Sequence, residues 1–167
     1  MLKIMNLYAV LRAWIVMAIV ISIASCGLHL RGTADLSFHS IFIQGSTLVI
    51  SKNLVKTLNT NGVTVLPSAE GADLLLELVG EESEKRILSL SGKGVVNEFE
   101  LYYRVHYRAK LAGAELWSPV QTIEARRDYS YSDANLLAKE GEEKRLNENM
   151  QADVLSGLMR RLSALKK

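Results

Sequence analysis

The only cysteine in the chain, Cys26, stands where a specific covalent chemistry is expected. Before it come two spaced cations, Lys3 and Arg12, an apolar stretch over residues 13–23, and the small pair Ala24-Ser25. A basic start, an apolar core of about 7–15 residues and small residues before the cleavage point are typical of a secretory signal peptide. When cysteine follows the cleavage point, the pattern is a bacterial lipobox, in which the thiol is diacylated. We therefore expect lipid attachment at Cys26.

This interpretation predicts three segments: a cleaved signal peptide (1–25), a lipidated N-terminus and tether (26–36) and a folded domain (37–167). Two or more acyl chains hold a protein stably on a bilayer, whereas one holds it only marginally. Gly27 follows the cysteine instead of the Asp that retains lipoproteins in the inner membrane, which favours the outer membrane. An uncleaved transmembrane helix would need about 20 apolar residues, and Arg12 interrupts the stretch. A buried N-terminal helix of a cytosolic protein is the remaining alternative.

Other residues capable of chemistry do not form a catalytic set. None of the three histidines is spaced as a metal pair, and Ser163 with Lys166 matches a Ser-x-x-Lys spacing only in a charged tail. Gly92-Lys93-Gly94 is too short for a nucleotide-binding loop and indicates a hairpin turn. No nucleophile, base and orienting group can be named together. We expect a protein that is not an enzyme and has no metal or cofactor.

The composition indicates one neutral domain. The segment 1–25 holds two of the 20 Lys and Arg residues and none of the 18 acids, so the remainder carries 18 of each. Bulk charge therefore cannot attract nucleic acid, and any attraction to phosphate must come from a local cluster. With Cys26 acylated, no disulfide is available, and stability must come from the hydrophobic core.

The clearest structural signal is a strand over residues 97–111. Its odd positions from Phe99 to Ala109 are mostly apolar and its even positions mostly charged or polar, which predicts one buried face and one wet face. Arg127 falls on the apolar side of the following strand and suggests a local irregularity. The remaining expected elements are strands at 38–44, 63–66, 73–79, 83–91 and 116–131, and helices at 47–60 and from Ser132 or Asp133, as the cap, to about 165. Together they predict an α+β two-layer sandwich, a mainly antiparallel sheet with two helices packed on it.

Several fragments resemble one known family. They are Cys26-Gly27-Leu28-His29-Leu30-Arg31, the strand Asn97-Glu98-Phe99-Glu100-Leu101, Arg127-Asp128-Tyr129-Ser130-Tyr131, Leu137-Ala138-Lys139-Glu140, and Glu142-Glu143 leading to Met150, Asp153 and Leu158-Met159-Arg160-Arg161-Leu162. In order and spacing this set resembles the lipopolysaccharide-assembly lipoproteins of the LptE family. Leu28 departs from the family pattern, which usually has an aromatic residue there.

The resemblance implies a non-enzymatic role at the outer membrane. Such proteins sit in the lumen of the LptD β-barrel, help it assemble and contact lipopolysaccharide while it is inserted into the outer leaflet. By motif, the resemblance points to Lys139 and Lys93 as lipopolysaccharide contacts, with Arg86 as a weaker candidate. Arg104, Arg108 and Lys110 alternate on one strand face within reach of a single anion, although a solvated or barrel-facing surface is the favoured interpretation.

A second function remains open at this stage. A periplasm-facing carrier or chaperone lipoprotein could shield an acyl chain, but it would need an apolar cavity. The sequence shows no apolar residues beyond those needed for a core between one sheet and two helices. A peptidoglycan-binding role has no supporting motif.

Overall fold

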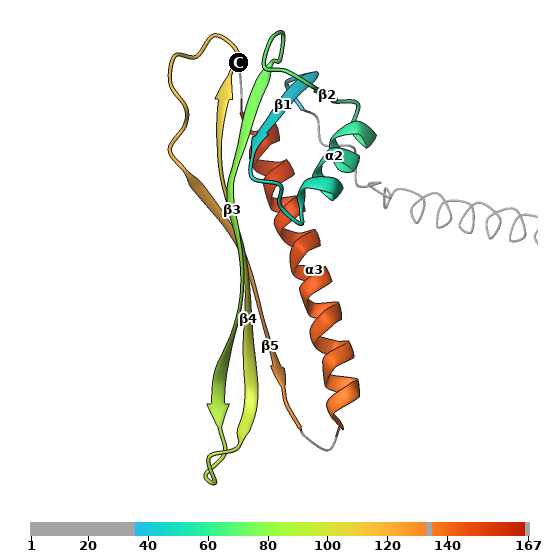
Figure 1. Cartoon of the computed structure of the whole chain (residues 1–167), viewed down its shortest axis with the longest axis vertical. Coiled ribbons are helices and arrows are strands. Elements are labelled where there is room, and N and C mark those ends of the chain that lie inside the picture. Colours follow the sequence, from blue (N-terminus) through green and yellow to red (C-terminus); the bar gives the residue numbers. More distant parts are fainter. Residues whose placement is uncertain (1–35, 133–134, 166–167) are drawn as a thin grey trace, which may run out of the picture. The chain divides into compact units, whose positions relative to one another are not determined.

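The computed structural model describes residues 36–132 and 135–165, which form one sheet with helices on one side (Figure 1). The expected signal peptide, Cys26 and all but the last residue of the tether lie outside the described residues. The last expected tether residue, Leu36, is buried against the core. In chain order the elements are β1 (Ser40–Gly45), α2 (Ser51–Thr60), β2 (Thr64–Leu66), β3 (Leu74–Leu90), β4 (Val96–Leu111), β5 (Gln121–Ser130) and α3 (Leu136–Ser163).

The five strands lie in the order β2-β1-β3-β4-β5. Strand β1 pairs in parallel with both β2 and β3, whereas β3, β4 and β5 pair antiparallel. The two helices α2 and α3 cover the same face of the sheet (Figure 1). The predicted α+β two-layer sandwich with a mainly antiparallel sheet is therefore confirmed.

Strand β3 is one continuous strand, so the prediction of separate strands at 73–79 and 83–91 was wrong. The reason is a bulge: Leu78 lies opposite Tyr107 and Gly80 opposite His106, which leaves Val79 as an extra residue. Before the bulge, the even-numbered leucines of β3 are buried beneath the helices. From Gly80 to Ile87, even-numbered residues face away from the helices, because one extra residue turns the side chains that follow it to the opposite face.

The sheet has fewer strands at one end. Strand β1 ends at Gly45, opposite Leu78, and beyond Gly80 the strand β3 pairs only with β4. We call this end the distal sheet; it consists of residues 80–90 of β3, 96–106 of β4 and all of β5. The outer face is the face of the distal sheet that points away from the helices. The hairpin tip between β3 and β4 and the start of α3 lie at this same distal end (Figure 1).

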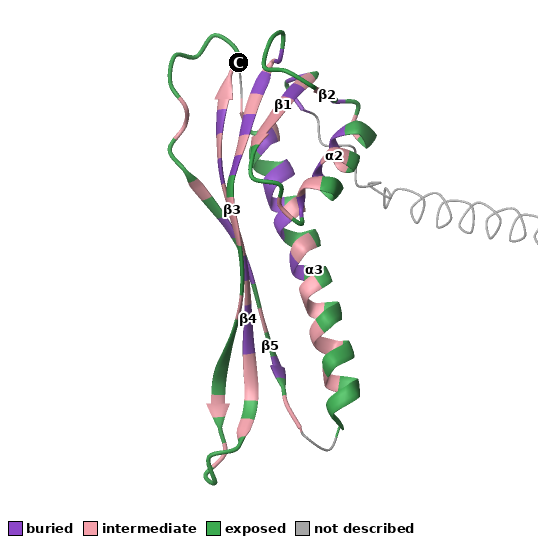
Figure 2. Ribbon diagram, viewed as in Figure 1, coloured by how far each residue is buried: buried purple, intermediate pink, exposed green. Residues whose placement is uncertain are grey.

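The hydrophobic core lies beneath both helices and extends along the distal sheet, where it includes Leu101, Tyr103, Val105, Ile123, Ala125 and Tyr129. Helix α2 contributes Leu54 and Leu58, and α3 contributes buried residues only from Met150 onward. Figure 2 shows buried segments along β4 and β5 toward the distal end, whereas the first half of α3 is exposed or partly exposed. Leu136, in the first turn of α3, is 46% exposed. The first half of α3 therefore extends beyond the core.

The ends of the helices and of β5 differ in detail from expectation. Helix α2 begins at Ser51 instead of Thr47, and β5 begins at Gln121, after Pro119. Helix α3 begins at Leu136 after an N-cap residue, Asn135, whose side chain makes no capping hydrogen bond. The expected cap Asp133 lies outside the described residues.

Arg127 is not at an irregularity, contrary to the sequence prediction. The pairing of β4 with β5 is regular throughout, with Arg127 opposite Leu101 on the helix-facing side. Its guanidinium forms an ion pair with Asp153 of α3, which explains how a charged residue is accommodated there. The partner lies on a distant element, so the alternation within the strand could not reveal it.

Gly45 allows β1 to turn away from β3, and its substitution provides a test of the fold. Its φ is +99°, and a Cβ atom there would lie 2.3 Å from the carbonyl oxygen of Leu78. We expect Gly45→Ala to lower the free energy of unfolding by roughly 2–5 kcal/mol, from left-handed strain plus the clash. Gly113 has a similar φ of +83° with no atom within 4 Å of the added Cβ. Gly113→Ala should therefore cost only about 1 kcal/mol in the same urea titration; equal losses would contradict the close approach.

Candidate functional site

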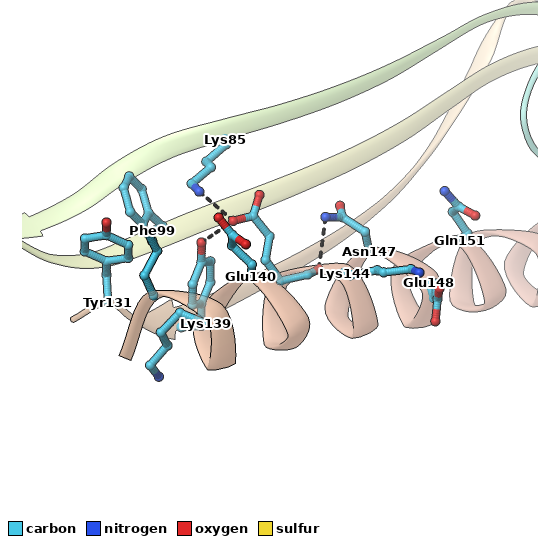
Figure 3. Close-up of a pocket in the computed structure, with 12 residues that line it drawn as sticks. Lys85, Phe99, Tyr131, Lys139, Glu140, Lys144, Asn147, Glu148 and Gln151 are labelled. Carbon is cyan, nitrogen blue, oxygen red and sulfur yellow. Dashed lines mark hydrogen bonds and ion pairs between the residues drawn. The ribbon is translucent and has the colours of Figure 1, made fainter. Parts of the chain in front are cut away.

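A groove of about 680 Å³ lies between the helix-facing side of the distal sheet and the first half of α3. We call it the distal groove. It exists because α3 continues along the sheet beyond the core without supplying buried apolar side chains before Met150. Figure 3 shows the side chains that line it. They come from β3, β4, β5 with the residues just after it, and α3: Lys85, Phe99, Tyr129, Tyr131, Leu136, Lys139, Glu140, Glu143, Lys144, Asn147, Glu148 and Gln151.

A lysine and a glutamate bridge the distal groove. Because of the bulge in β3, Lys85 faces α3, where its Nζ lies 2.5 Å from Oε2 of Glu143. The hydroxyl of Tyr129 donates a second hydrogen bond to the same oxygen, at 2.5 Å. The Lys85 ammonium also lies 4.2 Å from the centroid of the Phe99 ring, a distance suited to a cation–π contact. This cluster ties β3, β4 and β5 to α3 at the distal edge of the core, of which Tyr129 is itself a member.

The electrostatics of this cluster keep the pair charged. Burial works against the Glu143 carboxylate, but hydrogen bonds from Lys85 and Tyr129 outweigh it and lower the pKa of Glu143. Burial likewise works against the Lys85 ammonium, but the hydrogen bonds to Glu143 and Tyr129 and the attraction of their charges together outweigh it and raise the pKa of Lys85. Burial and the bond to Glu143 raise the pKa of Tyr129. Tyr129 therefore keeps its hydroxyl proton at neutral pH and donates a hydrogen bond to the Glu143 carboxylate.

Aromatic rings form the distal wall of the groove. The Phe99 and Tyr131 rings meet edge to face with centroids 5.1 Å apart, and Phe99 lies 5.9 Å from Tyr129. The rest of the lining is largely charged or amide-bearing, with Glu140, Lys144 and Glu148 among the α3 residues. The groove thus combines an apolar wall at its distal mouth with a polar body.

Lys139 lies at the rim of this groove. Its side chain lines the groove, while its ammonium contacts Oε2 of Glu142 at 2.8 Å and Oγ of Ser130 at 3.0 Å. Figure 3 shows the ammonium directed away from Lys85. Lys139 is thus held in place from both α3 and β5.

The other two candidate residues are not in the groove. Lys93 occupies the turn between β3 and β4, where Gly94 N–H donates to the Ser91 carbonyl; the Lys93 side chain is exposed and makes no ion pair with the described residues. Arg86 lies on the outer face, bound to Glu84 with Nε 2.5 Å from Oε1 and stacked 4.8 Å from the Tyr102 ring centroid. The structure therefore brings Lys93 and Lys139 to the same end and separates Arg86 from Lys139 by the sheet.

The basic row of β4 is neutralised by acids on the neighbouring strands. Arg104 bonds Glu124 of β5 and lies 3.3 Å from Glu84 of β3. Arg108 Nε lies 2.6 Å from Oε2 of Glu77. Lys110 donates to the Glu115 carbonyl at 3.1 Å. The row is therefore a paired, wet surface instead of a free anion site, in keeping with the interpretation favoured from the sequence.

One carboxylate on the outer face is buried. Glu100 is 8% exposed and accepts a hydrogen bond from the Tyr102 hydroxyl at 2.6 Å, while Arg126 Nε lies 2.7 Å away. The hydrogen bond to Glu100 raises the pKa of Tyr102. The outer face of the distal sheet is thus a ladder of alternating charges across three strands.

Sequence reasoning missed the bridge of Lys85, Glu143 and Tyr129. Lys85 lies in a stretch read only as a polar strand, and the bulge that turns it toward α3 leaves no local signature except Gly80. Among the described residues, no group of three or more histidine, cysteine or acidic side chains is arranged to hold a metal ion. Within the same residues, no helix combines the length and apolarity needed to cross a bilayer.

Comparison with known proteins adds a family and solved structures. A family model described as LptE, lipopolysaccharide-assembly, matches residues 38–162. An uncharacterized lipoprotein B from Nitrosomonas europaea is 39% identical, with coverage of 83% of this chain and 91% of that one, and a TM-score of 0.72. Rare lipoprotein B from Shewanella oneidensis is 25% identical over 75% of this chain and 94% of that one, with a TM-score of 0.67. A minor lipoprotein from Acinetobacter baumannii, 19% identical over 77% and 93% of the two chains, shares the fold at a TM-score of 0.61. No curated protein matches.

The bridge across the groove predicts a pH-dependent contribution to stability. Because the pKa of Glu143 is lowered in the folded state, its contribution is present above the ordinary value of 4.5 and is lost as the pH falls through the lowered value. We expect Glu143→Gln to lower the free energy of unfolding by about 1 kcal/mol at pH 7. Urea titrations of both proteins should converge as the pH falls from 4.5 through the lowered pKa of Glu143.

Glu140→Gln is the matched control, since Glu140 lines the same groove but forms no ion pair with the described residues. It should leave stability unchanged at both pH values. A stability gap for Glu143→Gln that persists at pH 3 would show that the side chain acts through packing instead of its charge.

Proposed function

Because this chain belongs to the LptE lipopolysaccharide-assembly family, we propose that it is an outer-membrane lipoprotein that plugs an LptD-like β-barrel. In this role it helps the barrel assemble and contacts lipopolysaccharide during its insertion into the outer leaflet. The observation that carries the proposal is the family match over residues 38–162, which runs from before β1 to the last turn of α3 and so includes the whole sheet and both helices. The role requires no catalysis.

The outer face of the sheet supports a place inside a barrel. The interior of large membrane barrels is polar and in contact with water. On this face, Arg104 and Arg108 are paired with acids from β3 and β5, so the surface is hydrophilic yet carries little unpaired charge. Such a surface can lie against polar barrel residues without leaving a buried charge unpaired.

The lipobox supports the anchoring of the protein at the membrane. Acylation of Cys26 and of the new amino terminus would hold the domain on the periplasmic side of the outer membrane, close to a barrel embedded there. The stretch between Cys26 and Leu36 would then be the tether that links the anchor to the domain. The rare lipoprotein B structure named above, from Shewanella oneidensis, belongs to a protein described as a lipoprotein.

Lysines at the distal end support the contact with lipopolysaccharide. Lys93 at the hairpin tip and Lys139 at the start of α3 lie at the same end of the domain, in the region that the family resemblance assigns to this contact (Figure 1). Ammonium groups form strong charge-assisted hydrogen bonds with phosphate oxygens. Arg86 contributes less, because its guanidinium is already bound to Glu84 on the other side of the sheet.

The carrier function is less well supported. A carrier must enclose an acyl chain in an apolar cavity, whereas the body of the distal groove is open and lined by Glu140, Lys144 and Glu148. Stoichiometric binding of a fluorescent fatty acid by the delipidated protein would favour a carrier over a plug.

Affinity purification from membranes tests the plug. We expect the wild-type protein to co-purify with a large outer-membrane β-barrel, identified by mass spectrometry, and to carry acyl chains at Cys26 in its intact mass. Cys26→Ala should lose the acyl mass and leave the outer membrane. Recovery of an acylated protein without any barrel would contradict the plug, and an unacylated wild-type protein would contradict the anchor.

Reversal of the two lysine charges tests the lipopolysaccharide contact. We expect Lys93→Asp with Lys139→Asp to weaken lipopolysaccharide binding at least about tenfold in a pull-down, because two charge-assisted contacts are replaced by repulsion. Lys52→Asp with Lys56→Asp, on the exposed side of α2, is the control with the same net charge change. Circular dichroism and barrel co-purification should be unchanged in both variants. Equal binding by the two double variants would reject Lys93 and Lys139 as contacts.

A further inference from the structure

Large apolar side chains are exposed at the distal end in unusual number. Among the described residues, ten large apolar side chains are exposed, and six of them lie at the hairpin tip or in the first turn of α3. These six, which we call the distal apolar patch, are Ile87, Leu88, Leu90, Val95, Leu136 and Leu137. Single exposed apolar residues are common on proteins, but a cluster marks a surface that contacts a partner or a lipid.

The fold explains why nothing within the described domain covers this patch. Register shifts between Ile87 and Ser89 and between Ser89 and Leu90 turn apolar side chains to both faces of the hairpin tip. The tip extends beyond the start of α3, so the helix cannot shield it (Figure 1). Figure 2 shows only exposed or partly exposed residues around this end.

The patch continues into the distal groove. Ile87 lies opposite Phe99 in the pairing of β3 with β4. Phe99 in turn contacts Tyr131 edge to face, and Leu136 lines the same groove. An apolar surface thus runs from the hairpin tip to the aromatic wall at the mouth of the groove.

The charge beside the patch is positive. No acidic residue occurs between Lys85 and Asn97, and Lys93 in the middle of this stretch has no acidic partner among the described residues. The next acid, Glu98, accepts a hydrogen bond from Oγ of Ser89 at 2.6 Å. A free cation within an apolar patch is complementary to an amphiphile that has an anionic head beside its hydrocarbon chains.

We infer that the distal apolar patch is an acyl-chain contact site, on which the hydrocarbon chains of lipopolysaccharide lie while its phosphates reach the nearby lysines. The inference rests on the proposed function and deepens it, because it assigns the chains, and not only the phosphates, to a named surface. The site is a contact surface open to solvent, and it differs from the enclosed cavity that a carrier would need. An acyl chain on the patch contacts apolar side chains of the protein in place of the acyl chains of neighbouring lipid molecules. Binding there therefore separates it from those molecules.

Two forms of the ligand test the site. Purified full-length lipoprotein, at one fixed detergent concentration, is titrated with lipopolysaccharide and with the same molecule stripped of all its acyl chains, which keeps the sugars and phosphates. We expect the wild type to bind the acylated form at least about tenfold more tightly. Leu90→Ser with Leu137→Ser should lose that preference while keeping its affinity for the deacylated form, because only apolar contact is removed.

The chain offers a closely matched control. Leu90 and Leu137 are 55% and 84% exposed, and Val120 and Leu116, in the loop between β4 and β5 at the opposite end, are 54% and 82% exposed. Val120→Ser with Leu116→Ser should therefore keep the wild-type preference. Both double variants should retain the wild-type circular dichroism, since none of the four side chains is buried.

Each other outcome overturns a distinct statement. Equal binding of the two ligand forms by the wild type, or an unchanged preference in Leu90→Ser with Leu137→Ser, overturns the acyl-chain site and leaves the proposed function standing. Loss of barrel co-purification in that variant, with its ligand preference intact, identifies the patch as a protein interface and also overturns the site. Preferential binding to phosphatidylglycerol vesicles over lipopolysaccharide overturns the choice of ligand. Failure of the wild type to bind either form overturns the lipopolysaccharide contact itself.

Discussion

The arrangement of the distal half depends on one extra residue in β3. Val79 has no partner in β4, and from Gly80 to Ile87 each side chain of β3 faces the side opposite to the one an uninterrupted strand would give it. This shift sends Glu82 and Glu84 to the outer face, where Arg104 stands, and turns Lys85 toward α3. Without the bulge, two acids would face the helix and Lys85 would face water. The charge pairing of the distal half of β3 with Arg104 and with Glu143 therefore follows from a single backbone irregularity.

The two faces of the distal sheet are stabilised in different ways. On the outer face, arginines and acids from three strands neutralise one another, which makes a hydrophilic surface without a strong net field. On the other face, the first half of α3 has no buried side chain before Met150, and it is held by the bridge of Lys85, Glu143 and Tyr129. A polar bridge holds the helix and leaves room between helix and sheet, which is why a groove exists there.

The polarity of the domain changes along its length. The core half is closed by α2, by β1 and by the second half of α3, whereas the distal half has only three strands and one helix. The reduced cover leaves apolar side chains of the hairpin tip in solvent, beside an unpaired lysine. This amphiphilic surface at the distal end is the one to which we assign the proposed contact with lipopolysaccharide.

The sequence alone determined the features that depend on neighbours along the chain. The alternation in β4 predicted its two faces, because that pattern is local. The residues before Cys26 predict lipidation from an equally local pattern, and lipidation stays a prediction. The tertiary structure decided the bulge at Val79, the pairing of Arg127 with Asp153, and the neutralisation of Arg104 and Arg108. Each of these depends on the register between strands or on the position of α3, and register is set by contacts between residues far apart in the sequence. For the same reason the sequence could name Lys93 and Lys139 as candidates, while only the fold brought them to one end and placed Arg86 on the other face of the sheet.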